Sequence, residues 1–278
     1  MQLQFGKRAL DLSLPKVMGV LNRTPDSFSD GGAFIDFDSA LRHAEQMARE
    51  GAAIIDIGGE STRPGAQAVS VEQELERVIP LIERLAPEID IPISVDTSKP
   101  EVMRAAVAVG AGMINDIYAL RQPVALEAAC DCDVPMVLMH MQGEPRTMQK
   151  SPHYDNVVAE VKQFLEERVR VCEAAGIPHT NILIDPGFGF GKTLAHNLEL
   201  LRRLRELTTL GLPVVVGLSR KSSIGTLLGG LPADQRLHGS VAAAVVAVMN
   251  GANIVRAHDV KPTVEVLKVA AAVCGGEC

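Results

Sequence analysis

The chain has 278 residues, of which 47% are hydrophobic and 3% aromatic, so it can bury a large aliphatic core without needing disulfide bonds for stability. A formal net charge of −7 at pH 7 argues against a nucleic-acid-binding protein, because such proteins carry basic surfaces. The most apolar stretch, residues 240–249, is too short to cross a bilayer, and the first residues lack the apolar core of a signal peptide. None of the five cysteines forms a C-x-x-C pair, which is typical of free thiols in a reducing compartment. We therefore expect a cytoplasmic protein that binds neither nucleic acid nor a membrane.

Short runs of Val, Ile, Leu and Met recur along the chain, and each run ends in polar or ionisable residues. The eight runs occupy residues 16–22, 53–60, 91–98, 113–117, 135–140, 181–187, 213–220 and 253–259. Continuous apolar runs of this length are typical of parallel strands that are buried on both faces. Eight such strands in a chain of this size predict a closed (β/α)8 barrel.

Apolar residues recur at helical spacing between these runs. The expected helices span residues 38–50, 72–86, 98–109, 154–175, 194–210, 234–250 and 262–273. Gly51 and Gly176 suit the C-terminal caps of two helices, and Pro87 ends another. The regular alternation of strand and helix predicts the α/β class. Since no change in composition interrupts it, we expect a single barrel domain over residues 1–278.

Two of the connections are longer than a turn requires. Residues 22–37 follow the first expected strand and residues 58–70 follow the second, and both are rich in Gly, Ser, Thr, Asp and Pro. Long loops on the rim of a barrel frequently carry function. The alternative is that they are ordinary surface connections.

The polar residues that end the runs are expected to meet on one rim, because active sites of (β/α)8 barrels lie at the C-terminal ends of the strands. These residues are Asn22, Asp56, Asp96, Asn115, His140, Asp185, Ser219, Arg256 and His258. Asp96, Asn115 and Asp185 together suit a flat heterocycle with a donor and acceptor edge, and Lys221 adds a donor or a positive charge. The alternative for each single residue is a helix cap or a turn anchor.

Arg256 and His258 form an R-x-H pair at the end of the last run. Alternation along a strand places both on the same side, and the pair suits a phosphate or diphosphate. Asn22 and Arg63 are expected to approach from neighbouring loops. In the alternative interpretation, Arg256 pairs with an acid of the barrel and His258 caps a helix.

Two apparent motifs are misleading. Residues 186–193 resemble a phosphate-binding loop, but Pro186 stands where that motif requires glycine. The glycines of this stretch instead suit a close approach of backbone to a ligand. His140 has no second histidine at ligand spacing, so a metal site there is not expected.

Seven long segments, taken in chain order, are similar to the signatures of one enzyme family. They are LNRTPDSFSDGG (21–32), DIGGESTRPG (56–65), SVDTSKP (94–100), INDI (114–117), DPGFGFGK (185–192), GLSRKS (217–222) and RAHDV (256–260). The chain thereby resembles the dihydropteroate synthases over almost its whole length. One departure is Arg23, where the family usually has a small apolar residue.

The resemblance implies an enzyme of folate synthesis, and a target of sulfonamides, that joins (7,8-dihydropterin-6-yl)methyl diphosphate to 4-aminobenzoate. The implied pterin-binding residues are Asp96, Asn115, Asp185 and Lys221. The implied diphosphate-binding residues are Asn22, Thr62, Arg63, Arg256 and His258, with Asn22 also holding Mg²⁺. The implied aminobenzoate-binding residues are Phe28, Thr62, Pro64, Phe190, Lys221 and Ser222.

The implied chemistry needs no nucleophilic side chain, because the dihydropterin can delocalise positive charge while diphosphate leaves. The residues expected to act in this step are Asp30, Asp96, Lys221, Arg256 and His258. One alternative is a pterin barrel that presents a methyl donor to a corrinoid protein, and another is an inactive paralogue that acts as a scaffold. The small apolar faces of residues 242–249 and 266–273 further favour a homodimer, with packing against the barrel as the alternative.

Overall fold

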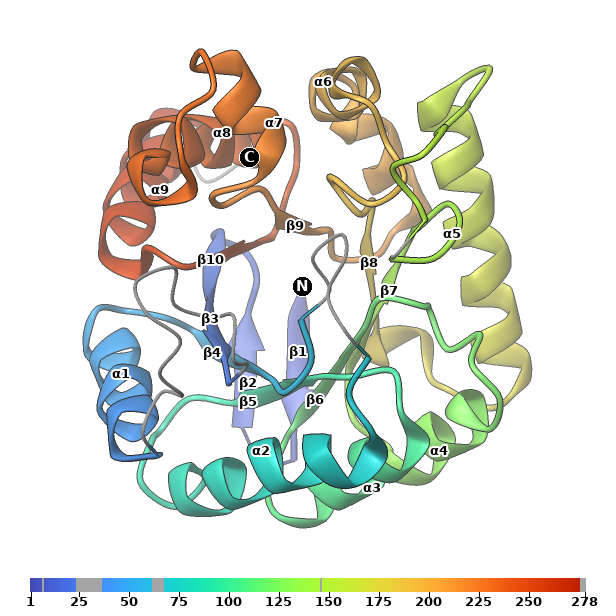
Figure 1. Cartoon of the computed structure of the whole chain (residues 1–278), viewed down its shortest axis with the longest axis vertical. Coiled ribbons are helices and arrows are strands. Elements are labelled where there is room, and N and C mark those ends of the chain that lie inside the picture. The colour runs from blue at the N-terminus through green and yellow to red at the C-terminus, as the bar shows by residue number, and fades with distance from the viewer. Residues whose placement is uncertain (7, 24–36, 62–67, 146, 276–278) are drawn as a thin grey trace.

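The computed structural model describes residues 1–6, 8–23, 37–61, 68–145 and 147–275, in which a ring of parallel strands is surrounded by helices (Figure 1). The strands of the ring are β3 (Lys16–Asn22), β4 (Ile54–Gly58), β5 (Ile93–Asp96), β6 (Met113–Asp116), β7 (Met136–Met139), β8 (Ile182–Asp185), β9 (Val215–Gly217) and β10 (Ile254–Ala257). Their order is β8-β7-β6-β5-β4-β3-β10-β9, and a parallel bridge between Ile184 and Val214 joins the two end strands. The predicted (β/α)8 barrel is therefore confirmed.

The helices follow the strands in the expected alternation. They are α1 (Phe37–Arg49), α2 (Val71–Leu85), α3 (Pro100–Ala108), α4 (Ala125–Cys132), α5 (Val157–Ala174), α6 (Leu194–Arg202), α7 (Ser222–Leu227), α8 (Leu237–Met249) and α9 (Val260–Val273), with short 3-10 helices at His179–Asn181, Leu204–Leu210 and Ala233–Gln235. Helix α2 begins with a capping box, in which the Ser70 side chain and the Gln73 side chain each bond the other's backbone N–H.

Three expectations about the helices are wrong. The stretch 194–210 is not one helix, because α6 ends at Arg202 and a 3-10 helix continues at Leu204–Leu210. The helix expected over residues 98–109 is shorter: α3 spans Pro100–Ala108, and its N-cap Lys99 makes no side-chain capping bond. The short helices α4 and α7 were not expected at all, since they have only 8 and 6 residues and give little periodic signal.

An N-terminal hairpin closes one end of the barrel. Strands β1 (Gln2–Phe5) and β2 (Arg8–Asp11) pair antiparallel and appear at the centre of the ring in Figure 1. Leu3, Phe5 and Leu12 are buried in one cluster with the barrel-interior residues Met18, Ile54, Met113, Val137, Leu183, Val215 and Ile254. Since these residues precede the polar ends of their strands, the hairpin lies at the end of the barrel opposite the candidate site.

Most of the remaining core lies between the strands and the outer helices, where aliphatic residues form one large cluster. Among the described residues no helix is long and apolar enough to cross a membrane. Cys130, Cys132 and Cys172 have free thiols. Cys274 is disulfide-bonded, so the expectation of free thiols throughout is wrong at that position.

Candidate active site

The polar rim expected from the sequence forms at the C-terminal ends of the barrel strands. Asn22, Asp96 and Asp185 are the last residues of β3, β5 and β8, and Asn115 is the third residue of β6. Asn115 and Asp185 are buried, with 7% and 6% of their surface exposed. The predicted residues Phe28, Asp30, Thr62, Arg63 and Pro64 lie outside the described residues.

Arg256 lies at the centre of this rim, where it bridges two carboxylates from other strands. Its Nε donates to Asp56 Oδ2 at 2.6 Å, and its Nη2 donates to Asp96 Oδ2 at 2.7 Å. The Asn115 side-chain amide also donates to Asp56 Oδ2, at 3.0 Å. Arg256 thus has the acidic partners that the alternative interpretation of this residue proposed.

Asp56 is a site residue to which sequence reasoning gave no role. It is fully buried in β4, and its Oδ1 has no hydrogen-bond partner. A buried carboxyl group requires hydrogen-bond partners, and Arg256 and Asn115 supply them to the other oxygen, Oδ2. Its position in the second apolar run indicated that Asp56 lies on the rim. Its partners could not be predicted from the sequence, because they are 59 and 200 residues away along the chain.

The network shifts the titration of Asp96. Burial raises the pKa of Asp96 to about 7, while Arg256 opposes this shift and the neighbouring Asp56 adds to it. Burial alone would lower the pKa of Arg256, but Asp56 and Asp96 hold it above its ordinary value. The rim therefore holds a permanent cation between two carboxylates, one of which titrates near neutral pH.

A second set of site residues, Asp185, Phe190 and Lys221, lies at the end of β8 and in the loops that follow β8 and β9. Asp185 Oδ1 accepts a hydrogen bond from Gly187 N at 2.6 Å, and burial raises the Asp185 pKa. The ammonium of Lys221 lies 4.3 Å from the centroid of the Phe190 ring, close enough for a cation–π contact. Burial lowers the Lys221 pKa to about 8, against the opposing effect of Asp185. Ser222, another predicted residue, begins α7 directly after Lys221.

Lys192 is a second residue whose place was not predicted. Its buried amino group, whose pKa burial lowers to about 7, donates to the carbonyl oxygens of Gly187 (2.9 Å) and Phe190 (3.0 Å) and lies 2.9 Å from His140 Nδ1. Burial lowers the His140 pKa to about 2, so this imidazole is neutral and can accept. Lys192 thus fixes the glycine-rich turn that carries Phe190.

The close backbone approach expected of these glycines is present at Gly187. Its φ of +68° is in the left-handed region, and a Cβ at this position would lie 1.9 Å from the His140 carbonyl oxygen. Only glycine fits there. The lysine of the apparent phosphate-loop motif points to carbonyl oxygens, which agrees with rejecting that motif.

The segments after β9 and β10 are tied together beside this group. The backbone N–H of His258 donates to Ser219 Oγ at 3.2 Å, and His258 Nδ1 lies 3.1 Å from the same oxygen. Arg220 forms a two-bond pair with Asp259, with distances of 3.0 and 2.6 Å. These contacts keep Lys221 and His258 on the same side of the rim.

Asn22 is suited to share a Mg²⁺ ion with an anionic ligand. A Cβ placed on Gly58 would lie 3.2 Å from Asn22 Oδ1 and 3.7 Å from Asp96 Oδ2, so these two oxygens flank Gly58 at the mouth of the barrel. Among the described residues no group of three or more His, Cys, Asp or Glu could hold a metal. An amide and a carboxylate oxygen are ligands of the kind that Mg²⁺ takes, and Mg²⁺ commonly completes its shell from phosphate and water.

Comparison with known proteins agrees with this geometry. Residues 18–258 match the family described as pterin binding enzyme. The dihydropteroate synthase of Escherichia coli (strain K12) is 57% identical over 261 residues, which cover 94% of this chain and 92% of the relative. A structure of Xanthomonas albilineans dihydropteroate synthase with 4-aminobenzoic acid has 57% identity and a TM-score of 0.92, and covers 98% of this chain and 97% of that one. Another, in complex with 7,8-dihydropteroate, has 54% identity and a TM-score of 0.89 and covers 98% of each chain. The chain therefore belongs to the dihydropteroate synthase family of pterin-binding transferases.

Proposed function

We propose that this member of the family joins (7,8-dihydropterin-6-yl)methyl diphosphate to 4-aminobenzoate, giving 7,8-dihydropteroate and diphosphate. The observation that carries the proposal is the rim formed by the buried Asn115 and Asp185 and the largely buried Asp96, beside the Lys221–Phe190 pair. It is further supported by the bound 4-aminobenzoic acid and 7,8-dihydropteroate in relatives more than half identical to this chain.

The buried carboxylate, amide and ammonium groups are suited to bind the pterin. A carboxylate accepts two hydrogen bonds, so Asp185 suits the adjacent amino and ring N–H groups of a reduced pterin. Asp56 fixes the Asn115 amide, and the Lys221 ammonium adds a donor to the same side. In this proposal the pterin ring lies at the mouth of the barrel, over the residues that end β5, β6 and β8.

The anionic part of the substrate is assigned to the side of the rim formed by Asn22, Arg256 and His258. The bond between the pterin methylene and the diphosphate oxygen breaks first, and the electron pair leaves with the diphosphate. Asp96 then stabilises the pterin cation electrostatically, a role we extend to Asp30, and Arg256 and His258 stabilise the departing charge with Arg63 and Thr62. Asn22 would hold Mg²⁺, which when bound neutralises part of the diphosphate charge.

The aminobenzoate nitrogen completes the reaction by attacking the methylene and losing a proton. We assign its site to Phe190, Lys221 and Ser222 together with Phe28, Thr62 and Pro64. The decisive test is release of diphosphate that requires both substrates and Mg²⁺. Methyl transfer to a corrinoid protein, or no turnover despite pterin binding, would instead favour one of the two alternatives.

The order of binding gives a further prediction. Residues assigned to aminobenzoate come from four separate segments, so we expect 4-aminobenzoate to bind free enzyme weakly. Prior binding of pterin and diphosphate should strengthen it by about tenfold or more, as expected when a first ligand organises the site for a second. Calorimetric titration with and without these ligands measures the difference, and equal affinities would contradict the prediction.

The pH dependence follows from Asp96 and Lys221. Asp96 has a raised pKa of about 7, so its stabilising carboxylate forms as the pH rises through that value. Lys221 has a lowered pKa of about 8, so its ammonium is lost above that value. We expect kcat/KM for the pterin diphosphate to rise through pH 7 and to fall through pH 8, since this parameter reports groups of the free enzyme. Asp96→Asn should abolish the rise but keep the fall, whereas a flat wild-type profile would contradict this assignment.

We further propose that the protein is a cytoplasmic homodimer, joined through the outer faces of α8 and α9. Val246, Met249, Val269 and Val273 are 43%, 48%, 66% and 77% exposed there, and the last three border a groove of about 390 Å³. Val269→Glu should weaken the dimer by about 30-fold or more, because a buried unpaired charge costs several kcal/mol. Sedimentation equilibrium measures this, and a monomeric wild type would contradict the dimer.

A further inference from the structure

The segment at the end of β6 contains two successive residues in the left-handed region, and we call residues 116–121 the β6 turn. Ala119 and Leu120 have φ angles of 52° and 57°, and both are buried. This conformation is strained for residues that carry a Cβ, so two of them in a row need support from their surroundings. Asn115, which is assigned to the pterin, lies directly before the turn in β6.

The first residue of the β6 turn bonds the N–H groups that follow it. Asp116 is fully buried, and its carboxylate accepts from Tyr118 N at 2.9 Å and from Leu120 N at 2.7 Å. Burial raises the pKa of Asp116, whereas these two bonds and one from the Ser98 side chain lower it. One carboxylate therefore holds the N–H side of the turn.

Two arginines bond the carbonyl oxygens of the β6 turn. Arg168 of α5 donates from Nε to the Ala119 oxygen at 2.9 Å and from Nη2 to the Leu120 oxygen at 3.3 Å. Arg121 donates from Nε to the Tyr118 oxygen at 2.9 Å. A guanidinium presents several donors in a fixed fork, which suits two neighbouring acceptors. The Arg168 fork therefore bonds the carbonyl oxygens of both left-handed residues.

The β6 turn also carries apolar side chains of the candidate site. Ile117 and Tyr118 pack in one apolar cluster with Phe190, whose ring centroid lies 4.3 Å from the Lys221 ammonium. Asn115 lies at the other end of the same short segment. The turn therefore joins a pterin-binding residue to the apolar side chains around Phe190.

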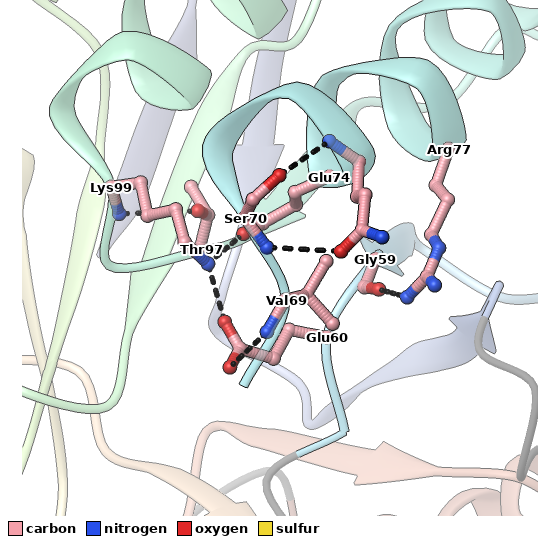
Figure 2. A network of polar contacts seen from close by, with 9 residues as sticks. Gly59, Glu60, Val69, Ser70, Glu74, Arg77, Thr97 and Lys99 are labelled. Carbon is pink, nitrogen blue, oxygen red and sulfur yellow. Dashed lines mark hydrogen bonds and ion pairs between the residues drawn. The ribbon is translucent and has the colours of Figure 1, made fainter. Parts of the chain in front are cut away.

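The opposite flank of Asn115 is held by different contacts. Thr97 N donates to the Asn115 carbonyl oxygen at 3.1 Å. Two residues further on, Lys99 forms ion pairs with Glu60 and with the buried Glu74 of α2 (Figure 2). These contacts join the loop after β5 to α2 and involve no group of α5. A substitution on α5 that removes a bond to the β6 turn therefore acts on the turn and not on this flank.

We propose that Arg168 is a positioning residue for the pterin half of the reaction, acting through the β6 turn. The inference rests on the proposed function, which places the pterin over the ends of β5, β6 and β8. Without the Arg168 fork, Ala119 and Leu120 lose bonds that offset their strain, and the turn relaxes together with Ile117 and the end of β6. The pterin then meets a site that is ordered less well in advance, which weakens its binding.

The test is calorimetric titration of Arg168→Ala with a pterin that lacks the diphosphate, at a temperature well below the Tm of the variant. We expect its Kd to rise by about 3- to 10-fold, which is the loss of a modest hydrogen-bond contribution. Arg168→Lys should recover part of this loss, because an ammonium lacks the fork that bonds two carbonyl oxygens. Arg170→Ala is the matched control: Arg170 is also on α5 but pairs with Glu166 of the same helix, so Kd should stay within about twofold of wild type.

Ala119→Gly tests the route through the turn. Glycine adopts the left-handed conformation without strain, so adding Arg168→Ala to this variant should raise Kd by no more than about twofold. An unchanged Kd in folded Arg168→Ala, the same rise in Arg170→Ala, or effects that simply add in the double variant would overturn the proposal. If Arg168→Ala does not fold, Arg168→Lys carries the test, and a Kd equal to that of wild type would overturn the proposal.

A wild type that binds no pterin would instead contradict the proposed function. In that case thermal unfolding still decides whether Arg168 supports the strained turn. Arg168→Ala should lower Tm less in the Ala119→Gly chain than in the wild type, because glycine needs less support there. Equal shifts of Tm would overturn the role of Arg168.

Discussion

Arg256→Ala is expected to lower the free energy of unfolding by about 3–5 kcal/mol, because removing one partner of a buried ion pair leaves the other charge uncompensated. Here the fully buried Asp56 and the largely buried Asp96 both lose the guanidinium that bridges them. Denaturant unfolding at pH 7 measures the loss. An unfolding free energy within about 1 kcal/mol of wild type would show that the network is dispensable.

The pH dependence of this variant provides an internal check. The folded-state pKa of Asp96 is raised to about 7 from an ordinary value of 3.8, so its carboxyl group contributes stability at low pH that is lost as the pH rises through 7. In the wild type the Arg256 guanidinium opposes the upward shift of the Asp96 pKa. Without Arg256 that shift should therefore grow. The free energies of unfolding of variant and wild type should therefore differ least near pH 5 and most near pH 8, with the variant the less stable.

His258→Ala separates anion binding from this structural effect. His258 bonds Ser219 and is only part-buried, so we expect a small change in stability. If His258 binds diphosphate, its loss should weaken binding of the pterin diphosphate by about 10- to 150-fold, while the affinity for a pterin without diphosphate stays unchanged. Equal losses for both ligands would indicate a structural role.

Asp185→Asn is expected to weaken pterin binding by about 2–4 kcal/mol while the protein stays folded. The carboxylate accepts from Gly187 N through Oδ1, and an asparagine keeps this bond if its oxygen takes the same place. Its amide would then present a donor where the pterin also presents donors, which leaves polar groups unpaired in a buried site and removes a charge-assisted bond.

The measurement is a pterin titration of the variant alongside its thermal melt. Asp155→Asn makes the same change on a fully exposed side chain and should have no effect on binding. A folded Asp185→Asn protein that binds pterin within about twofold of wild type would remove Asp185 from the recognition site.

Much of the architecture could be predicted from local sequence patterns. Runs such as 16–22 and 181–187 identify buried parallel strands because the central residues of each run are buried on both faces of the sheet. The strand ends also predicted which residues share a rim, since parallel strands all deliver their last residues to the same side. The N-terminal hairpin escaped prediction because its strands, QLQF and RALD, mix polar and apolar residues. The equally short barrel strands lie in continuous apolar runs, which carry a stronger signal.

The pairing of side chains was decided only by the tertiary structure. Closing the barrel brings Arg256 to Asp56 across 200 residues of sequence, and no local pattern specifies which of several rim acids it meets. Lys192 turned to carbonyl oxygens because Gly187 brings the chain against His140. Arg23 likewise donates to the Arg77 carbonyl oxygen of a helix 54 residues further on. Sequence periodicity reports which face of an element is buried, whereas these contacts depend on how the faces of different elements are set against one another.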